Sequence, residues 1–143
     1  MENPIKDEIK KKYSKIVVSG NDDCCCMPGE CDSGDSPIDA TKLIGYDQKE
    51  LESIPQEAIL GVGCGAPINH TKLKEGEIVV DLGSGAGIDI FLAARKVLDS
   101  GKAIGIDMTD DMLEKARENA KKGNYPNVEF KKGDIEENIP LNN

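Results

Sequence analysis

The sequence contains no tryptophan, a single histidine and few aromatic residues of any kind, which together make up 3% of its 143 residues. It also lacks an excess of positive charge, because 18 Lys and Arg face 27 Asp and Glu, a net charge of −9. Nucleic acids and anionic lipids attract basic surfaces, so we expect no nucleic-acid partner. No apolar run approaches the roughly 18 residues of a membrane-spanning helix, and we expect no membrane partner.

The start of the chain, Met1-Glu2-Asn3-Pro4, carries no apolar signal region. The pattern therefore predicts a cytoplasmic protein, and the length suffices for one domain. In a reducing compartment the five cysteines are expected to be free thiols, metal ligands or redox groups and not a disulfide framework.

The first 76 residues form an expected N-terminal extension with little core of its own. Residues 4–18 predict an amphipathic helix, because apolar side chains recur on one face at Ile5, Ile9, Tyr13 and Ile16. A helix this short is marginal alone, so we expect it to pack on another part of the molecule.

Glycine, aspartate, serine and proline dominate residues 19–41, and this composition predicts a loop. Four of the cysteines lie in it: Cys24, Cys25, Cys26 and Cys31. A short helix is expected to begin at Asp47 and to end before Pro55. The following segment, residues 61–67, surrounds Cys64 with glycines and is too glycine-rich for regular structure.

From Glu77 the pattern changes to alternating strands and helices. Strands are expected at residues 78–82, 102–107 and 127–131. Helices are expected between them at residues 88–98, with Ile88, Phe91, Leu92 and Leu98 inward, and at residues 110–122, with Thr109 as a cap. This order predicts an α/β fold with a parallel sheet and right-handed crossovers.

A glycine-rich turn follows the first of these strands, with glycines at Gly83, Gly85 and Gly87. Such a turn lets a ligand approach the backbone amides at the start of a helix. A phosphate-binding loop would need Gly-Lys-Ser/Thr, which is absent. Ile88 occupies the last glycine position of the dinucleotide fingerprint, so a nicotinamide cofactor fits poorly. The third candidate ligand is S-adenosylmethionine, which has no pyrophosphate and so does not require a turn built for anions.

Two aspartates end the next two strands. Asp107 lies where a carboxylate can accept hydrogen bonds from ribose hydroxyls, and Asp134 lies where one can reach an adenine edge. Turn and aspartates together predict a nucleoside ligand. The alternative, in which both aspartates only cap the segments that follow them, stays open.

Several motifs together resemble the S-adenosylmethionine-dependent arsenite methyltransferases. They are Asp81-Leu82-Gly83-Ser84-Gly85-Ala86-Gly87, Gly105-Ile106-Asp107-Met108-Thr109, Gly133-Asp134-Ile135-Glu136, the early cysteines Cys24-Cys25-Cys26 and Leu60-Gly61-Val62-Gly63-Cys64-Gly65-Ala66-Pro67. The resemblance implies a Rossmann-like class I methyltransferase fold, of which residues 77–143 are the first half, truncated after about three parallel strands. It places the cofactor against Asp81, Gly83, Ser84, Gly85, Gly87, Asp107, Met108, Asp134 and Ile135.

The resemblance also implies a reaction, methyl transfer to trivalent arsenic in arsenic detoxification. Soft thiolates suit this thiophilic centre. Cys64 matches a catalytic cysteine that ligates arsenic, and one or more of Cys24, Cys25 and Cys26 match a redox cysteine. The substrate is then arsenite or its thiol conjugates, and a thiol reductant of the thioredoxin or glutathione type completes the cycle.

The family continues beyond the end of this chain, so we expect an N-terminal part that is inactive alone. Its first strand would be an uncovered edge that allows self-association of the fragment. Two other functions stay open: a methyltransferase for another small molecule, and a non-catalytic thiol module that binds arsenite or another soft metal.

Overall fold

Three parallel strands organise the part of the chain that the computed structural model describes, which comprises residues 3–19, 36–63, 65–137 and 139–141. The strands are β1 (Ile78–Leu82), β2 (Lys102–Asp107) and β3 (Val128–Lys132). The helices are α1 (Pro4–Ser19), α2 (Pro37–Leu43), α3 (Gln48–Glu52), α4 (Ile88–Val97) and α5 (Asp110–Lys122), with short 3-10 turns η1 (Gln56–Ala58) and η2 (Pro67–His70).

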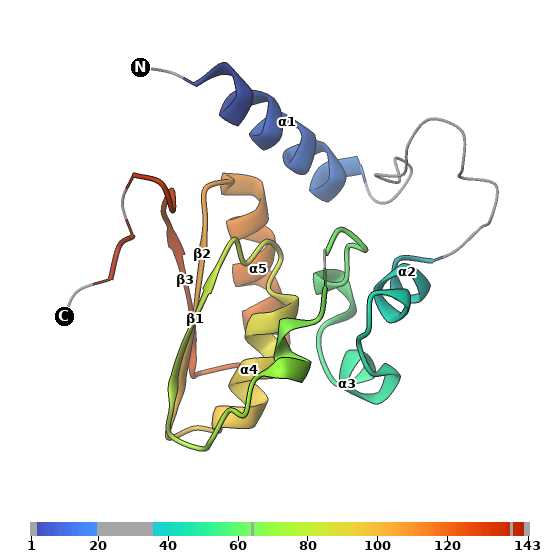
Figure 1. Cartoon of the computed structure of the whole chain (residues 1–143), viewed down its shortest axis with the longest axis vertical. Helices are drawn as coiled ribbons and strands as arrows, with labels where there is room; N and C mark the ends of the chain where they lie inside the picture. The colour runs from blue at the N-terminus through green and yellow to red at the C-terminus, as the bar shows by residue number, and fades with distance from the viewer. Residues whose placement is uncertain (1–2, 20–35, 64, 138, 142–143) are drawn as a thin grey trace.

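The strand order is β1-β2-β3, and each neighbouring pair is parallel. Val80 pairs with Ile104, and Ile104 pairs with Glu129. The two crossover helices, α4 and α5, lie on the same side of the sheet (Figure 1). This arrangement confirms the α/β fold with three parallel strands that the sequence predicts.

The few aromatic residues are concentrated where the helices meet the sheet. Phe91 of α4 is fully buried, and its ring centroid lies 4.8 Å from that of Tyr125 and 5.9 Å from that of Phe130. Aliphatic side chains from α4, α5 and β2 surround this group, and others come from the segment around α3 and η1. The extension therefore shares one core with the strand-and-helix unit.

The side of β1 that faces away from the helices is apolar and exposed. Ile78 is 71% exposed, and Val80 and Leu82 are also exposed, while Val79 between them packs into the core. β1 is one of the two edge strands of the sheet in the described part of the chain. Every second side chain of this apolar strand is therefore not covered by any other part of the described chain.

The structure corrects two local predictions and bears out a third in part. Helix α2 occupies part of the expected loop at residues 19–41, because Ser36 caps it and Pro37 takes its first position. Leu98, expected to point inward, ends α4 with a φ of 58° and is about half exposed. Thr109 is the N-cap residue of α5, as predicted, although its side chain makes no cap hydrogen bond.

Helix α1 packs against α5, as expected of an apolar helix face, but only part of that face is buried. Ile16 is buried, whereas Ile5, near the other end of the helix, is 67% exposed. In Figure 1 this helix crosses above the end of the sheet at which β2 leads into α5. None of the helices in the described residues is both long and apolar enough to span a bilayer.

Candidate functional site

The glycine turn between β1 and α4 is fastened to the end of β2. The backbone N–H groups of Gly83 and Ser84 both donate to the carbonyl oxygen of Ile106, at 2.8 and 3.0 Å. Gly83 has a φ of +83°, which favours glycine, and a Cβ built there would meet no atom within 4 Å. The turn therefore leaves open space beside the backbone at the carboxyl ends of the strands.

Gly87 lies against the aromatic core. Its φ is +100°, and an added Cβ would lie 2.8 Å from Phe91 and 2.9 Å from Phe130. Glycine here lets the start of α4 approach the aromatic core. Gly87 does not line the cavity described next.

A cavity of about 710 Å³ lies at this end of the sheet, within the range typical of small-molecule sites. The structure brings eight of the nine predicted cofactor-binding residues together on its wall: Asp81, Gly83, Ser84, Gly85, Asp107, Met108, Asp134 and Ile135. They come from the ends of three successive strands. Helix α1 contributes Ile9 and Tyr13 to the same wall.

Asp107 connects the glycine turn to the start of α5. Its Oδ2 accepts a hydrogen bond from the backbone N–H of Gly85 at 2.9 Å, and its Oδ1 accepts one from that of Thr109 at 2.8 Å. The second bond is the capping contact that the sequence left open, while the first reaches 22 residues back along the chain. Each carboxylate oxygen keeps another lone pair with which it can accept a ligand hydroxyl.

The wall of the cavity is acidic. Asp81, Asp89, Asp107 and Asp134 line it, and no Lys or Arg does so among the described residues. Burial raises the pKa of Asp81 to about 6, and the neighbouring carboxylates of Asp89 and Asp107 add to the shift. Such a site favours a cationic ligand and disfavours a pyrophosphate.

Asp89, which the sequence analysis did not single out, carries a second buried carboxylate. Burial raises its pKa, and the opposing influence is the hydroxyl of Tyr46, which donates to Oδ2 at 2.8 Å. Its Oδ1 and the Oγ of Ser84 are buried and make no hydrogen bond within the described part of the chain. Buried polar atoms usually have partners, so two unsatisfied groups on one cavity wall indicate where a polar ligand binds.

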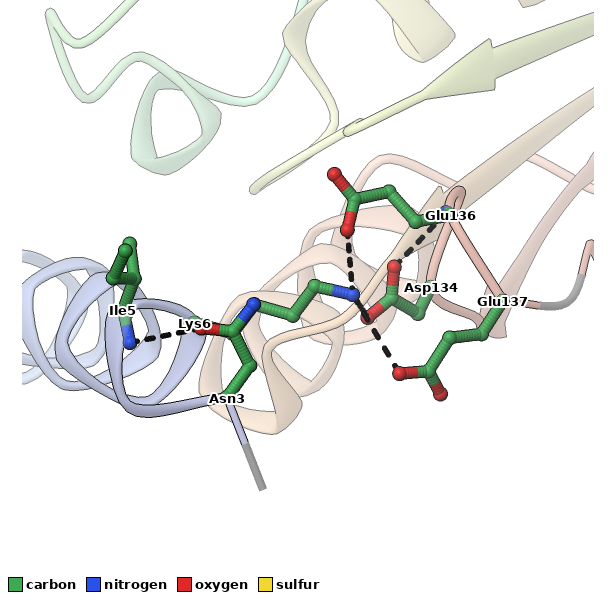
Figure 2. A network of polar contacts seen from close by, with 6 residues as sticks. All are labelled: Asn3, Ile5, Lys6, Asp134, Glu136 and Glu137. Atoms are coloured by element: carbon green, nitrogen blue, oxygen red, sulfur yellow. Dashed lines mark hydrogen bonds and ion pairs between the residues drawn. The ribbon is translucent and has the colours of Figure 1, made fainter. Parts of the chain in front are cut away.

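Asp134 is held by a residue from the far end of the chain. The ammonium group of Lys6 in α1 lies 2.6 Å from Asp134 Oδ2, and Figure 2 shows this contact. Asp134 Oδ1 accepts from the backbone N–H of Glu136 at 3.0 Å, the capping contact foreseen as an alternative. The hydrogen bond from Lys6 is the main cause that lowers the pKa of Asp134.

The predicted catalytic and arsenic-binding cysteines, Cys24, Cys25, Cys26 and Cys64, lie outside the described residues, as does Cys31. Gly63 and Gly65, which flank Cys64 in the sequence, both line the cavity, and so does His70. Within the described residues no group of three His, Cys, Asp or Glu side chains is placed to hold a metal ion.

Comparison with known families identifies the part of the chain that holds this cavity wall. The profile of a methyltransferase domain family matches residues 73–143, the segment that carries the glycine turn and all three strands. The chain belongs to the methyltransferase family. The acidic aspartates at the ends of β1 and β2 and the turn that follows β1 thus lie in a methyltransferase domain.

Two curated relatives of this methyltransferase are arsenite methyltransferases. The protein of Halobacterium salinarum is 41% identical over 91% of this chain and 35% of its own length. That of Aquipseudomonas alcaligenes is 29% identical over 92% of this chain and 36% of its own length. The chain thus spans about a third of these relatives. A solved methyltransferase from Aquifex aeolicus overlaps 75% of this chain and 51% of its own, with 31% identity and a TM-score of 0.49.

Proposed function

We propose that this chain is the N-terminal part of a cytoplasmic arsenite methyltransferase, an enzyme of arsenic detoxification that is inactive without the rest of its sheet. One observation carries the choice of substrate. The match to the Halobacterium arsenite methyltransferase covers 91% of the chain and so extends over most of residues 1–72, ahead of the methyltransferase profile. The N-terminal extension at residues 1–76 then belongs to arsenic chemistry, and residues 77–143 hold the cofactor.

The cavity fits S-adenosylmethionine, whose sulfonium and ammonium groups outweigh its carboxylate. When bound, the cofactor supplies an electrophilic methyl group on a positively charged sulfur. Asp81, Gly83, Ser84 and Gly85 then form the wall around its methionine part. Asp107 accepts from the ribose hydroxyls, and Asp134 faces the base between Met108 and Ile135.

The acidic wall is the physical support for this assignment. The carboxylates of Asp81 and Asp89 are costly to ionise while they are buried without a cation. A cationic ligand offsets that cost, whereas the pyrophosphate of a dinucleotide would increase it. Gly87 then has a packing role, and it shapes the cofactor site through the start of α4.

The arsenic site is proposed around Cys64. Its sequence neighbours Gly63 and Gly65 line the cavity, so a thiolate there would hold arsenic beside the cofactor. Cys24, Cys25 or Cys26 would serve as the redox cysteine, which a thioredoxin or glutathione type of reductant regenerates. Trivalent arsenic has a lone pair of its own, so the chain needs no general base and its task is positioning.

Cofactor binding is tested by titrating the amide NMR spectrum of the 143-residue chain with S-adenosylmethionine. We expect shifts that are concentrated in residues 83–87, 107–109 and 133–135. NAD serves as the control and should leave these signals in place. A dispersed spectrum that moves with NAD and not with S-adenosylmethionine would contradict the cofactor assignment.

Arsenic chemistry is tested on the longer protein with arsenite and reductant, comparing Cys64→Ser with wild type. Methylarsenic production should collapse in the variant, and the 143-residue chain alone should show no turnover. If the enzyme methylates another small molecule, Cys64→Ser will leave that activity intact. If the chain is a thiol module, mass spectrometry will show stoichiometric arsenic on the Cys64→Ser chain without any cofactor binding.

A further inference from the structure

The ammonium group of Lys6 lies among three carboxylates at the edge of the cavity. It is 2.6 Å from Asp134 Oδ2, 2.8 Å from Glu136 Oε2 and 3.6 Å from Glu137 Oε1 (Figure 2). The side chains of Lys6 and Asp134 are only 15% and 18% exposed, whereas both glutamates lie largely in solvent. The Lys6–Asp134 pair is therefore the shielded centre of the network, and the glutamates surround it.

Lys6 shares one face of α1 with the residues that look onto the cavity. Lys6 is followed on α1 by Ile9, Tyr13 and Ile16, at successive spacings of three, four and three residues. These spacings place all four residues on one side of the helix. Ile16 is buried, while Ile9 and Tyr13 line the cavity and remain partly exposed. The helix is thus anchored at one end by Ile16, tied at the other by Lys6, and faces the cavity between them.

Lys6 does not itself line the cavity at the carboxyl ends of the strands, but Asp134 does. Both oxygens of Asp134 have protein partners, Oδ2 in Lys6 and Oδ1 in the backbone N–H of Glu136. These two contacts fix the plane of the carboxylate while each oxygen retains a lone pair. Lys6 can therefore affect a bound ligand only through the position and charge of Asp134.

We propose that α1 is a lid on the cofactor cavity and that Lys6 is the positioning residue that latches this lid to Asp134. The inference rests on the proposed function, since it takes the adenine base of S-adenosylmethionine as the group that Asp134 meets. Lid closure holds Asp134 toward the 6-amino group of the base, and a base in place favours the closed lid. The two events are coupled, so each strengthens the other.

The affinity test uses S-adenosylhomocysteine and isothermal titration calorimetry on the whole chain. We expect Lys6→Met to raise the Kd about tenfold and Lys6→Arg, which keeps the charge, to stay within about threefold of wild type. Lys11→Met is the matched control, because Lys11 is an exposed lysine of the same helix, and it should leave the Kd unchanged. Equal affinity of Lys6→Met and wild type would overturn the latch.

A second ligand separates positioning from a general structural effect. It is the S-adenosylhomocysteine analogue whose purine lacks the 6-amino group. Wild type should bind it about tenfold more weakly than the parent compound, and Lys6→Met should weaken it no further. If Lys6→Met weakens both ligands by the same factor, Lys6 does not act through the base, and the positioning role is wrong.

The lid itself is tested first in wild type, and this part of the test does not depend on how any variant folds. Hydrogen exchange of the α1 amides should slow on addition of S-adenosylhomocysteine, and this protection should be lost in Lys6→Met. Binding without any change in α1 would overturn the lid while leaving the proposed function intact. Failure of wild type to bind the ligand at all would instead overturn the proposal that residues 77–143 of this chain hold the cofactor, and the lid with it.

Discussion

At the scale of single residues, Gly105 shows how closely the cavity wall is built against the core. A Cβ at this position in β2 would lie 2.6 Å from Phe130 and 2.6 Å from the Oγ of Ser84. Phe130 belongs to the aromatic core, and Ser84 belongs to the glycine turn. Gly105 therefore determines how near the turn can come to the sheet.

The variant Gly105→Ala should destabilise the fold by about 1–3 kcal/mol, because neither neighbour is the free end of a flexible chain. It should also weaken cofactor binding, since Ser84 must move. Gly65→Ala is the stability control, because a Cβ there meets nothing within 4 Å. The stability of both variants is measured by urea unfolding. Equal unfolding midpoints for Gly105→Ala and Gly65→Ala would contradict the expected clash.

Asp81 provides a pH signature of the acidic wall. Its pKa is raised to about 6 in the folded protein, so the folded state binds this proton more tightly than the unfolded state does. The stabilisation that follows is complete below pH about 4 and is lost as the pH rises through about 6. The shift corresponds to at most about 3 kcal/mol.

We therefore expect the unfolding free energy of wild type to fall between pH 4.5 and 7.5 more steeply than that of Asp81→Asn. Asp99→Asn, at an exposed position, is the control and should keep the wild-type profile. Affinity for S-adenosylmethionine should move the other way, increasing with pH, because ionised Asp81 attracts the cationic cofactor. Parallel profiles of wild type and Asp81→Asn in urea unfolding would show that Asp81 titrates normally.

At the scale of elements, α4 depends on a contact from the start of β3. The side-chain amide of Asn127 donates to the carbonyl oxygens of Ala94 and Leu98, at 3.0 and 2.8 Å. The Ala94 carbonyl also accepts from the backbone N–H of Leu98, and the Leu98 carbonyl from that of Gly101, so Asn127 adds a second donor to each carbonyl at the end of α4. Asn127 therefore joins the end of α4 to the strand that follows α5.

Replacing Asn127 by aspartate keeps the shape and removes both donors. It also places a negative charge at the carboxyl end of a helix, which the helix dipole disfavours. We expect Asn127→Asp to lower the unfolding free energy by about 1–3 kcal/mol, measured by urea denaturation at pH 7. Asn127→Ser retains one donor, so it should lower the unfolding free energy by less. An unchanged midpoint for Asn127→Asp would contradict a role for these bonds.

The sequence predicts the elements with strong periodicity and fails where the signal is local and short. β1, β2, β3, α4 and α5 follow from apolar periodicity. Helix α2 was expected to be loop because its composition resembles the segment before it. Its start does carry a signal, since Ser36 accepts from the N–H of Asp39 and Pro37 follows the cap.

The candidate site divides in the same way. Asp107 and the glycine turn are recognisable because strand, turn and helix are contiguous in the sequence. Tyr46 and Asp89 meet across 43 residues, and Lys6 and Asp134 across 128, so no local pattern reveals either pair. The partners of such polar contacts are set by how distant segments pack, and a single sequence does not contain that information in a local pattern.

At the scale of the whole molecule, the described sheet ends in an apolar edge. Ile78, Val80 and Leu82 of β1 project from the side that lacks helices and are exposed. An open apolar edge strand tends to pair with another chain. In the proposed full enzyme further strands would cover β1, whereas the chain alone leaves it free.

We expect the isolated chain to associate reversibly at micromolar concentrations, as followed by sedimentation velocity. Val80→Lys should reduce this association without changing α4 or α5, because its side chain points away from the core. Leu43→Lys is the control, since Leu43 is an exposed apolar residue of α2 and should leave association unchanged. A monomer at all concentrations for wild type would show that β1 does not pair.

The ion pair between Lys6 and Asp134 also bears on how the chain is made. Lys6 of helix α1 leaves the ribosome 128 residues before its partner Asp134, a delay on the order of ten seconds at ordinary rates of synthesis. Throughout that interval the helix has no cavity to cover and no carboxylate to bind, and a helix of 16 residues is only marginally stable alone. A segment that is synthesised early is therefore among the last to reach its native place, and until then its apolar face is available to molecular chaperones.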